Sequence, residues 1–252
     1  MSHFDYKGKK IFYEDVGNGR PLLLLHGNTA SGKIFAPVVP LFAEKCRVIT
    51  LDFLGCGQSD RIEKWPEDLW YEWGEQAAAL CGHLGLKDIY VIGSSGGALA
   101  AINMTLTRGD LVHAVVADSF EGVKADQSLT ENIRIGRSYA KQNENFRSLL
   151  QMMHGNNWES VLDADTEAVI GHAKHIGNFF HCPISCLHRK MLLTGSAEDE
   201  MFPQGHYEKL FGTICSETPY ASKHIFEHGG HPAMISNAEA FIPLCEAFFS
   251  GE

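Results

Sequence analysis

Residues Ile89–Gly97, with the sequence Ile-Tyr-Val-Ile-Gly-Ser-Ser-Gly-Gly, decide how this chain folds. The run Ile89–Ile92 is apolar throughout, as in a strand that is buried on both faces of a parallel sheet. The Ala- and Gly-rich stretch Ser95–Thr107 predicts a helix. Between them lies the pattern Gly-x-Ser-x-Gly, which places Ser95 on a tight strand-to-helix turn and is typical of a nucleophilic serine. Ser94 lies one residue out of register with this pattern.

Comparable apolar runs recur along the chain and predict a sheet. An N-terminal hairpin and five more strands are expected, at residues 4–13, Leu22–Leu25, Val48–Leu51, Val112–Ala117, Met191–Leu193 and, more weakly, His224–Phe226. Helical patterns separate these runs. One covers Pro66–Leu84, with Pro66 in its first turn and Gly85 as its C-cap, and a final helix begins at Asn237. The alternation predicts an α/β fold with a mostly parallel central sheet and helices on both faces.

One stretch of about 70 residues breaks this alternation. Residues 119–188 carry no strong strand signal, and amphipathic helices are expected around Leu129–Met153 and Asp165–Phe180. We therefore divide the chain into an α/β core, residues 1–118 and 189–252, and a helical lid, residues 119–188, inserted before the strand Met191–Leu193. Apolar side chains of the lid are candidates to line a substrate pocket or, alternatively, to pack the lid onto the core: Trp158, Phe146, Phe179, Met152, Met153 and Phe180.

A serine hydroxyl needs a base that removes its proton. His231 lies in the sequence His-Gly-Gly-His-Pro, after the last predicted strand and before the last helix. The two glycines allow a sharp turn that aims the imidazole at the site, so His231 is the predicted base and His228 the alternative.

The base needs an acid that orients it and stabilises its cation. The loop that follows Met191–Leu193 offers three consecutive carboxylates, Glu198, Asp199 and Glu200. Asp199 lies where this loop turns back and is the predicted acid. Asp118, at the end of an earlier strand, remains a second possible acid.

Backbone N–H groups near the serine would stabilise the oxyanion of a tetrahedral intermediate. The sequence His-Gly-Asn-Thr, residues 26–29, follows the strand Leu22–Leu25 and predicts a tight turn there. We expect the N–H groups of Asn28 and Gly96 to form the oxyanion hole, with Thr29 as the neighbouring candidate. His26 is expected to support the loop.

Composition and charge exclude several classes of protein. The formal net charge of −10 argues against binding of nucleic acid, which requires a basic face. No apolar run reaches the ~18 residues of a membrane span, and no signal region is evident, so a cytoplasmic location is expected. The seven cysteines include no Cys-x-x-Cys pair and read as reduced thiols. The His and Cys residues of the lid match no zinc pattern, and we expect neither a metal nor a cofactor.

Together these segments resemble the α/β-hydrolase superfamily, in the expected order and over nearly the whole chain except the lid. The matching landmarks are His26-Gly27, Asp52–Ser59, Gly93–Gly97, Gly195–Asp199 and Gly230-His231. In that family the Asp52–Ser59 loop is structural, and the same role is expected here. The serine at position 95 argues against dehalogenases and epoxide hydrolases, whose nucleophile is Asp. Many relatives carry His or Asn at the position of Ser94 and a larger apolar residue at that of Gly96.

The resemblance implies a serine hydrolase that cleaves a small carboxylic ester, a lactone or a thioester through an acyl-enzyme. Hydrolysis of a carbon–carbon bond and acyl transfer to another acceptor are alternatives within the same fold. A ligand-binding receptor-like protein that retains the triad is an alternative of another class. The expected partner is a small molecule, and the sequence leaves the natural substrate and the oligomeric state open.

Overall fold

A computed structural model describes residues 2–125 and 127–251, without the side chains of residues 127–129. Its centre is an eight-stranded sheet with the strand order β1-β2-β4-β3-β5-β6-β7-β8. β1 pairs antiparallel with β2 and β2 with β4, whereas all later neighbours run parallel. The strands are β1 (Ser2–Tyr6), β2 (Lys9–Gly17), β3 (Arg20–Leu25), β4 (Cys46–Leu51), β5 (Ile89–Ser94), β6 (Val112–Asp118), β7 (Lys190–Ser196) and β8 (Ala221–Phe226). The predicted mostly parallel sheet is confirmed.

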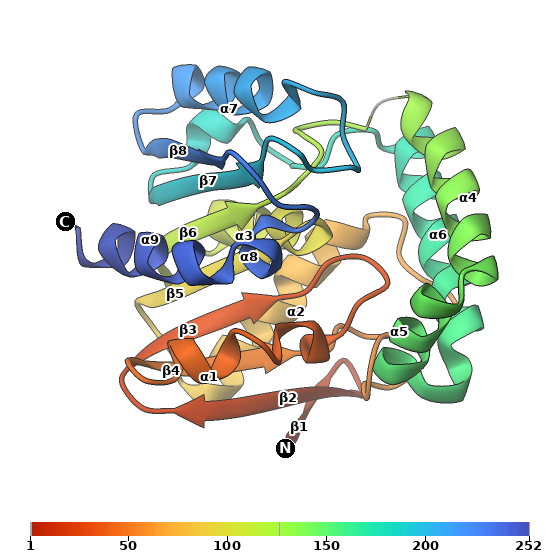
Figure 1. The fold of residues 1–252 in the computed structure, drawn as a ribbon. Helices are drawn as coiled ribbons and strands as arrows, with labels where there is room; N and C mark the ends of the chain where they lie inside the picture. Colours follow the sequence, from red (N-terminus) through yellow and green to blue (C-terminus); the bar gives the residue numbers. More distant parts are fainter. Residues whose placement is uncertain (1, 126, 252) are drawn as a thin grey trace.

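The apolar runs became strands because helices cover both faces of the sheet. Leu22 to Leu25 are all fully buried, although alternate side chains point to opposite faces. The helices on one face are α2 (Leu69–Leu84), α3 (Gly96–Thr107) and α7 (His206–Glu217). The other face is covered by η1 (Gly32–Phe35), α1 (Val39–Phe42), α8 (Ala233–Ser236) and α9 (Ala238–Ser250). Figure 1 shows these two helical layers around the sheet.

The first long helix begins later than the sequence pattern indicates. α2 starts at Leu69 rather than at Pro66, which stays in the preceding loop. The Glu67 carbonyl accepts a hydrogen bond from His172 at 3.0 Å, and the Asp68 carboxylate contacts His181. These tertiary contacts hold residues 67 and 68 outside the helix. Gly85 ends the helix in a left-handed conformation with φ of 66°, as expected.

Three helices are inserted between β6 and β7, beyond the carboxyl ends of the parallel strands (Figure 1). They are α4 (Gln127–Gln142), α5 (Glu144–His154) and α6 (Trp158–His175), with the short turns η2 (Gly155–Asn157) and η3 (Ile184–Cys186) after α5 and α6. We call α4, α5 and α6 the inserted helices.

The bounds of the inserted helices differ from the expected ones. The first expected range is split at Asn143, whose side chain accepts hydrogen bonds from two backbone N–H groups and so starts a new helix. The side chain of Leu129, at the start of that range, lies outside the described residues. The second helix begins earlier than expected, at Trp158, and ends at His175.

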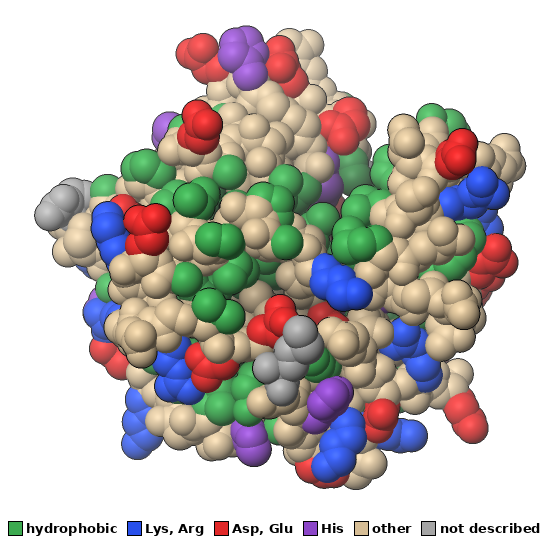
Figure 2. Space-filling view, turned by 60° about the horizontal axis from the view of Figure 1, so that its bottom comes forward, with side chains coloured by type: hydrophobic (Ala, Val, Ile, Leu, Met, Phe, Trp, Pro, Cys, Tyr) green, Lys and Arg blue, Asp and Glu red, His purple; other side chains and the backbone are tan. Residues whose placement is uncertain are grey.

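Charged side chains are mixed on the face drawn in Figure 2. Basic groups there lie beside acidic ones instead of forming one continuous basic surface. None of the helices in the described residues is both long and apolar enough to cross a membrane.

Candidate active site

Ser95 occupies a strained turn between β5 and α3. Its backbone has φ of 56° and ψ of −126°, a conformation that residues with a side chain rarely adopt and that costs about 1–3 kcal/mol. The flanking glycines permit the turn. A Cβ on Gly93 would lie 2.1 Å from the Gly97 carbonyl oxygen, and one on Gly97 would lie 2.0 Å from that of Leu25. The Ser95 N–H donates to the Asp118 carbonyl at 2.8 Å, which ties the turn to the neighbouring strand.

The structure brings His231 and Asp199 together. The Nδ1 of His231 lies 2.8 Å from Oδ2 of Asp199, and their side chains are only 11% and 1% exposed. The second Asp199 oxygen accepts the Met201 N–H at 2.9 Å. Glu200 accepts the main-chain N–H of His231 at 3.1 Å. His231 is therefore held at both its ring and its backbone.

A further partner of Asp199, not predicted from the sequence, is Tyr207 of α7, whose hydroxyl donates to Oδ2 of Asp199 at 2.6 Å. The same carboxylate oxygen thus receives Tyr207 and His231. The Tyr207 ring is buried and lies against Gly195, and a Cβ on Gly195 would come within 2.6 Å of this ring. Tyr207 lies eight positions after Asp199, but no motif in that interval indicates the contact.

Replacing Tyr207 by phenylalanine is expected to lower the free energy of unfolding by about 1.5–3 kcal/mol, the range for a hydrogen bond to a charged group. The ring packing stays, so the change reports the lost donor to Asp199. Urea unfolding followed by circular dichroism measures it. The control is Tyr139→Phe, whose side chain is 58% exposed and should change stability by less than about 0.5 kcal/mol. Equal stability of the two variants would contradict this account of the Asp199 carboxylate.

The charges of this pair shift both pKa values in the direction that favours an ion pair. Burial alone would lower the pKa of His231, but the hydrogen bond and the charge of Asp199 outweigh it, and the net pKa is raised. Burial alone would raise the pKa of Asp199, yet the hydrogen bond to His231 and its charge leave that pKa lowered. The imidazole is thus a stronger base than a free histidine.

Topology gathers these side chains at one edge of the sheet. Ser95 follows β5, Asp199 follows β7 and His231 follows β8, and these strands are parallel members of one continuous array. The carboxyl ends of parallel strands meet at the same edge, where ligand sites of open α/β sheets lie. The predicted serine, acid and histidine therefore share one end of the sheet, facing the inserted helices in Figure 1.

The alternative histidine, His228, and the alternative acid, Asp118, have other partners. The side chain of His228 is 80% exposed and contacts Glu198, which accounts for that carboxylate. Asp118 is fully buried and accepts hydrogen bonds from the hydroxyls of Thr194 and Ser119 and from the Met234 N–H, at 2.8, 3.2 and 3.0 Å. Burial raises the pKa of Asp118 to about 6, against the opposing effect of these donors. Asp118 anchors the segment after His231 instead of contacting the imidazole.

The loop of residues 26–31 after β3, which we call the β3 loop, lies against the serine. A Cβ on Gly27 would come within 2.9 Å of Cβ and 3.4 Å of Oγ of Ser95. A Cβ on Gly96 would lie 2.0 Å from Oδ1 of Asn28. The absence of side chains at these two glycines lets the loop approach Ser95. Among the described residues, no main-chain acceptor binds the N–H of Asn28 or of Gly96.

Two buried residues support the β3 loop from below. His26 accepts the Phe53 N–H on Nε2 at 3.1 Å and contacts the Gly27 carbonyl through Nδ1 at 2.8 Å. Burial lowers the pKa of His26 to about 4, so this histidine is neutral. The carboxylate of Asp52 accepts the N–H groups of Gly32 and Gln58, both at 2.7 Å. These contacts agree with the structural role that was expected for His26 and Asp52.

Acidic residues near the site went unnoticed in the sequence. Glu121 follows β6, and its carboxyl group interacts electrostatically with both His231 and Asp165. Burial raises the pKa of Glu121, and the charge of His231 opposes this. Asp165 of α6 is fully buried and accepts the side-chain amide of Asn28 at 2.7 Å.

The predicted pocket residues of the lid have other surroundings. Trp158 packs with Leu150 and Leu162 in a small cluster within the inserted helices. Phe179 is fully buried and its ring meets that of Trp70 edge-on, so Phe179 packs against the core, as the alternative interpretation had it, whereas the Trp158 cluster lies within the inserted helices. Phe146 is 47% exposed and lies against the exposed ring of Tyr139, and its place in a pocket stays a prediction.

The same division holds for the remaining lid candidates. Met152 is 48% exposed, whereas Met153 and Phe180 are buried. Their positions do not mark out a substrate pocket, because amphipathic helices bury one face whether or not a ligand binds there.

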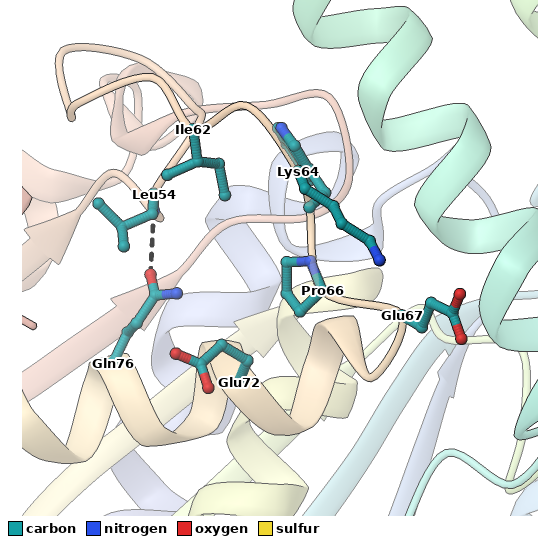
Figure 3. A pocket seen from close by; sticks show the side chains of 8 residues that line it. Leu54, Ile62, Lys64, Pro66, Glu67, Glu72 and Gln76 are labelled. Carbon is teal, nitrogen blue, oxygen red and sulfur yellow. Dashed lines mark hydrogen bonds between the residues drawn. The ribbon is translucent and has the colours of Figure 1, made fainter.

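A groove of about 380 Å³ lies beside α2 (Figure 3), and neither Ser95 nor His231 is among its lining residues. Its walls are Leu54, Ile62, Lys64, Trp65, Pro66, Glu67, Glu72 and Gln76. Several of its polar groups already have protein partners. Gln76 accepts the Leu54 N–H at 2.9 Å, and Glu72 accepts hydrogen bonds from Tyr6 and Lys7.

Comparison with known proteins gives one family match. Residues 20–150, just over half of the chain, match the family model described as the alpha/beta hydrolase fold. This range includes β3, the β3 loop and the turn at Ser95.

Two curated relatives share the N-terminal part of the chain. A proline iminopeptidase from Clostridium botulinum is 40% identical over 106 residues, which cover 40% of this chain and 36% of the relative. Haloalkane dehalogenase 2 from Mycobacterium bovis is 30% identical over 116 residues, covering 45% of this chain and 39% of the relative. The matches thus span well under half the length of these relatives.

Solved structures resemble the whole chain. A meta-cleavage product hydrolase from Pseudomonas fluorescens superposes with a TM-score of 0.77 at 20% identity, and the match covers 100% of this chain and 98% of that one. At this level of identity the likeness shows the shared fold alone.

Proposed function

Because the chain belongs to the α/β-hydrolase family, we propose that it is a serine hydrolase that cleaves a small carboxylic ester, lactone or thioester through an acyl-enzyme. The observation that carries the proposal is the contact of 2.8 Å between His231 and the buried Asp199, at the same edge of the sheet as the strained Ser95. A histidine whose basicity is raised by a buried carboxylate is suited to activate a hydroxyl group.

In the first half of the reaction, Ser95 forms the acyl-enzyme. His231 removes the hydroxyl proton as Oγ of Ser95 attacks the carbonyl carbon of the substrate, and Asp199 stabilises the resulting imidazolium. The carbonyl π electrons move to oxygen, and the N–H groups of Gly96 and Asn28 bind this oxyanion. The tetrahedral intermediate then collapses, and His231 gives its proton to the departing alcohol or thiol.

In the second half, water replaces the leaving group. His231 removes a proton from water as its oxygen attacks the acyl carbon, and the same oxyanion site is used again. Collapse of this intermediate breaks the bond to Oγ of Ser95, which recovers its proton from His231. The carboxylic acid product is released, and the enzyme returns to its starting state.

Activity is expected to require the neutral imidazole of His231. Its pKa is raised above the ordinary value of 6.5, so kcat/KM for an uncharged ester should be full at alkaline pH. It should fall about tenfold per pH unit once the pH drops below this raised pKa, because the imidazolium cannot accept the serine proton. A pH series with p-nitrophenyl acetate measures the midpoint.

A matched pair of carboxylate variants tests the cause of this midpoint. Glu200 helps to raise the pKa of His231, whereas Glu198 contacts His228. Glu200→Gln should therefore lower the midpoint slightly and Glu198→Gln should leave it in place. A wild-type midpoint below pH 6.5 would contradict the assigned base.

Covalent labelling separates catalysis from ligand binding alone. A fluorophosphonate should modify Ser95 stoichiometrically, and p-nitrophenyl acetate should give a burst followed by steady turnover. Folded protein that is neither labelled nor active would favour a receptor-like binding protein. A panel of esters of varied acyl length, a lactone, a thioester and a prolyl amide would then define the substrate class. Turnover of the amide alone would overturn the assignment to esters.

A further inference from the structure

Each of the three inserted helices sends one polar side chain to the β3 loop. Arg137 of α4 donates to the Thr29 hydroxyl at 2.6 Å, and Asp165 of α6 accepts the Asn28 side-chain amide at 2.7 Å. His154, at the end of α5, contacts the Thr29 carbonyl through Nε2 at 2.9 Å. Arg137 also donates to Asp165 at 2.7 Å, which joins two of these groups.

The side chain of Asn28 has both of its polar ends engaged. Its NH2 group donates to Asp165, and its oxygen accepts the indole N–H of Trp70 at 3.0 Å. This amide fills the space beside Gly96, where a Cβ would lie 2.0 Å from its oxygen. Because both polar atoms of the Asn28 amide are held by hydrogen bonds, the main-chain N–H of Asn28 is held in place as well.

The next residue, Thr29, has a strained backbone that needs outside support. Its φ is 56°, which costs a non-glycine residue about 1–3 kcal/mol unless the surroundings hold it in place. The hydroxyl of Thr29 is held by Arg137 and its carbonyl by His154. Since Nδ1 of His154 accepts the Gly57 N–H at 3.0 Å, Nε2 carries the proton and donates to Thr29.

Burial and hydrogen bonds stabilise the ion pair between Arg137 and Asp165. The Asp165 side chain is fully buried and that of Arg137 is 22% exposed. A carboxylate in that position is stable only while partners satisfy it, and it receives Arg137 and Asn28 on separate oxygens. Burial raises the pKa of Asp165, and the charge of Arg137 and the hydrogen bond from Asn28 oppose this.

We propose that Asp165, Arg137 and His154 are positioning residues that hold the oxyanion-binding N–H of Asn28 in place, so that the oxyanion hole is complete only while the inserted helices are docked on the β3 loop. The inference rests on the proposed function and extends it. It assigns the inserted helices a part in transition-state binding in addition to covering the site.

The test compares Asp165→Asn with a matched control in the same helices. Lys141 of α4 pairs with Asp163 of α6 at 2.6 Å, as Arg137 pairs with Asp165, but no contact joins Lys141 to the β3 loop among the described residues. For Asp165→Asn, the acylation rate with p-nitrophenyl acetate should fall roughly 10- to 100-fold, part of the 10²–10³ that loss of a whole oxyanion donor costs. Lys141→Met should stay within about twofold of wild type.

A transition-state analogue distinguishes positioning from general loosening. A trifluoromethyl ketone adds to Ser95 and places a negative oxygen in the oxyanion hole, with the serine proton passing to His231. Its inhibition constant should rise for Asp165→Asn by the same factor as acylation falls, while KM for the small ester changes less than threefold. Activity that falls without a change in ketone affinity would overturn the proposal, as would equal behaviour of Asp165→Asn and Lys141→Met.

A second variant keeps the test valid if Asp165→Asn folds poorly. Asn28→Ala removes the same hydrogen bond and leaves the main-chain N–H of residue 28 in place. It should cause a similar loss, and the two changes together should be far from additive, because both remove one interaction. Fully additive effects would contradict the proposal. Wild-type protein that neither labels nor turns over ester would instead refute the proposed hydrolase function itself.

Discussion

Replacing Ser95 by alanine is expected to lower kcat on p-nitrophenyl acetate by about 10⁶-fold, the loss found when a nucleophilic serine is removed from such a triad. Oγ forms the covalent bond to the acyl group, and no other side chain lies on the strained turn after β5. The oxyanion donors and the binding surface remain, so a small residual rate above the uncatalysed reaction should persist. Fluorophosphonate labelling should be lost completely.

The control for this variant is the neighbouring serine. Ser94 is the last residue of β5 and is 4% exposed, so its hydroxyl is buried in the sheet. Ser94→Ala should keep activity within about threefold of wild type and should still be labelled. Both variants should unfold at wild-type urea concentrations, because alanine keeps the Cβ and the backbone at each position. Activity that survives in Ser95→Ala but not in Ser94→Ala would reverse the assignment of the nucleophile.

Replacing Asp199 by asparagine is expected to lower kcat by about 10⁴-fold. The carboxylate contacts Nδ1 of His231 and raises the pKa of that imidazole. An amide has no charge to stabilise the imidazolium. Its NH2 group would also favour the tautomer that leaves the proton on Nε2, where His231 could no longer accept the serine proton. Steady-state kinetics and the rate of fluorophosphonate labelling should both show the loss.

Asp118→Asn decides between the two candidate acids. Asp118 binds Thr194, Ser119 and the Met234 N–H, so its replacement should mainly reduce the free energy of unfolding, by about 1–3 kcal/mol. Its activity should stay within about tenfold of wild type at a temperature where the protein is folded. A loss as large as that of Asp199→Asn would show that the acid follows β6 and not β7.

Local signals explain why much of the fold could be predicted from the sequence. Leu22–Leu25 and Ile89–Ile92 read as strands because burial on both faces leaves no polar position in the run. The turn at Ser95 was recognisable because its neighbours must be glycine, as the 2.0 Å approach of a Gly97 Cβ to Leu25 shows. Asp199 and His231 were found by their place after a strand, and the structure joins them.

Contacts between distant segments explain what the sequence did not reveal. Asp165 looks like an ordinary residue of an amphipathic helix, and its partner Asn28, 137 positions away, becomes visible only when the chain is folded. The start of α2 was misplaced for the same reason, since His172 binds the residue before it from far along the chain. Tyr207 lies only eight positions from Asp199, but no motif marks that contact. Phe146 was named as a candidate either for a pocket or for packing of the lid onto the core, because periodicity does not tell which side of an inserted helix meets the core.

The order of strands in the sheet indicates which part of the active site would be lost first by local unfolding. Among the described residues, β8 pairs only with β7 and so lies at one edge of the sheet. Most of its side chains are at least partly exposed, yet the loop after it supplies His231. Segments with one neighbour and little burial open first under thermal fluctuation, long before the central strands separate. Local unfolding of β8 would move the His231 imidazole out of the site, while the turn at Ser95, between β5 and α3, stays folded. Protein in which this edge has opened would therefore lose activity while its circular dichroism spectrum stays nearly unchanged.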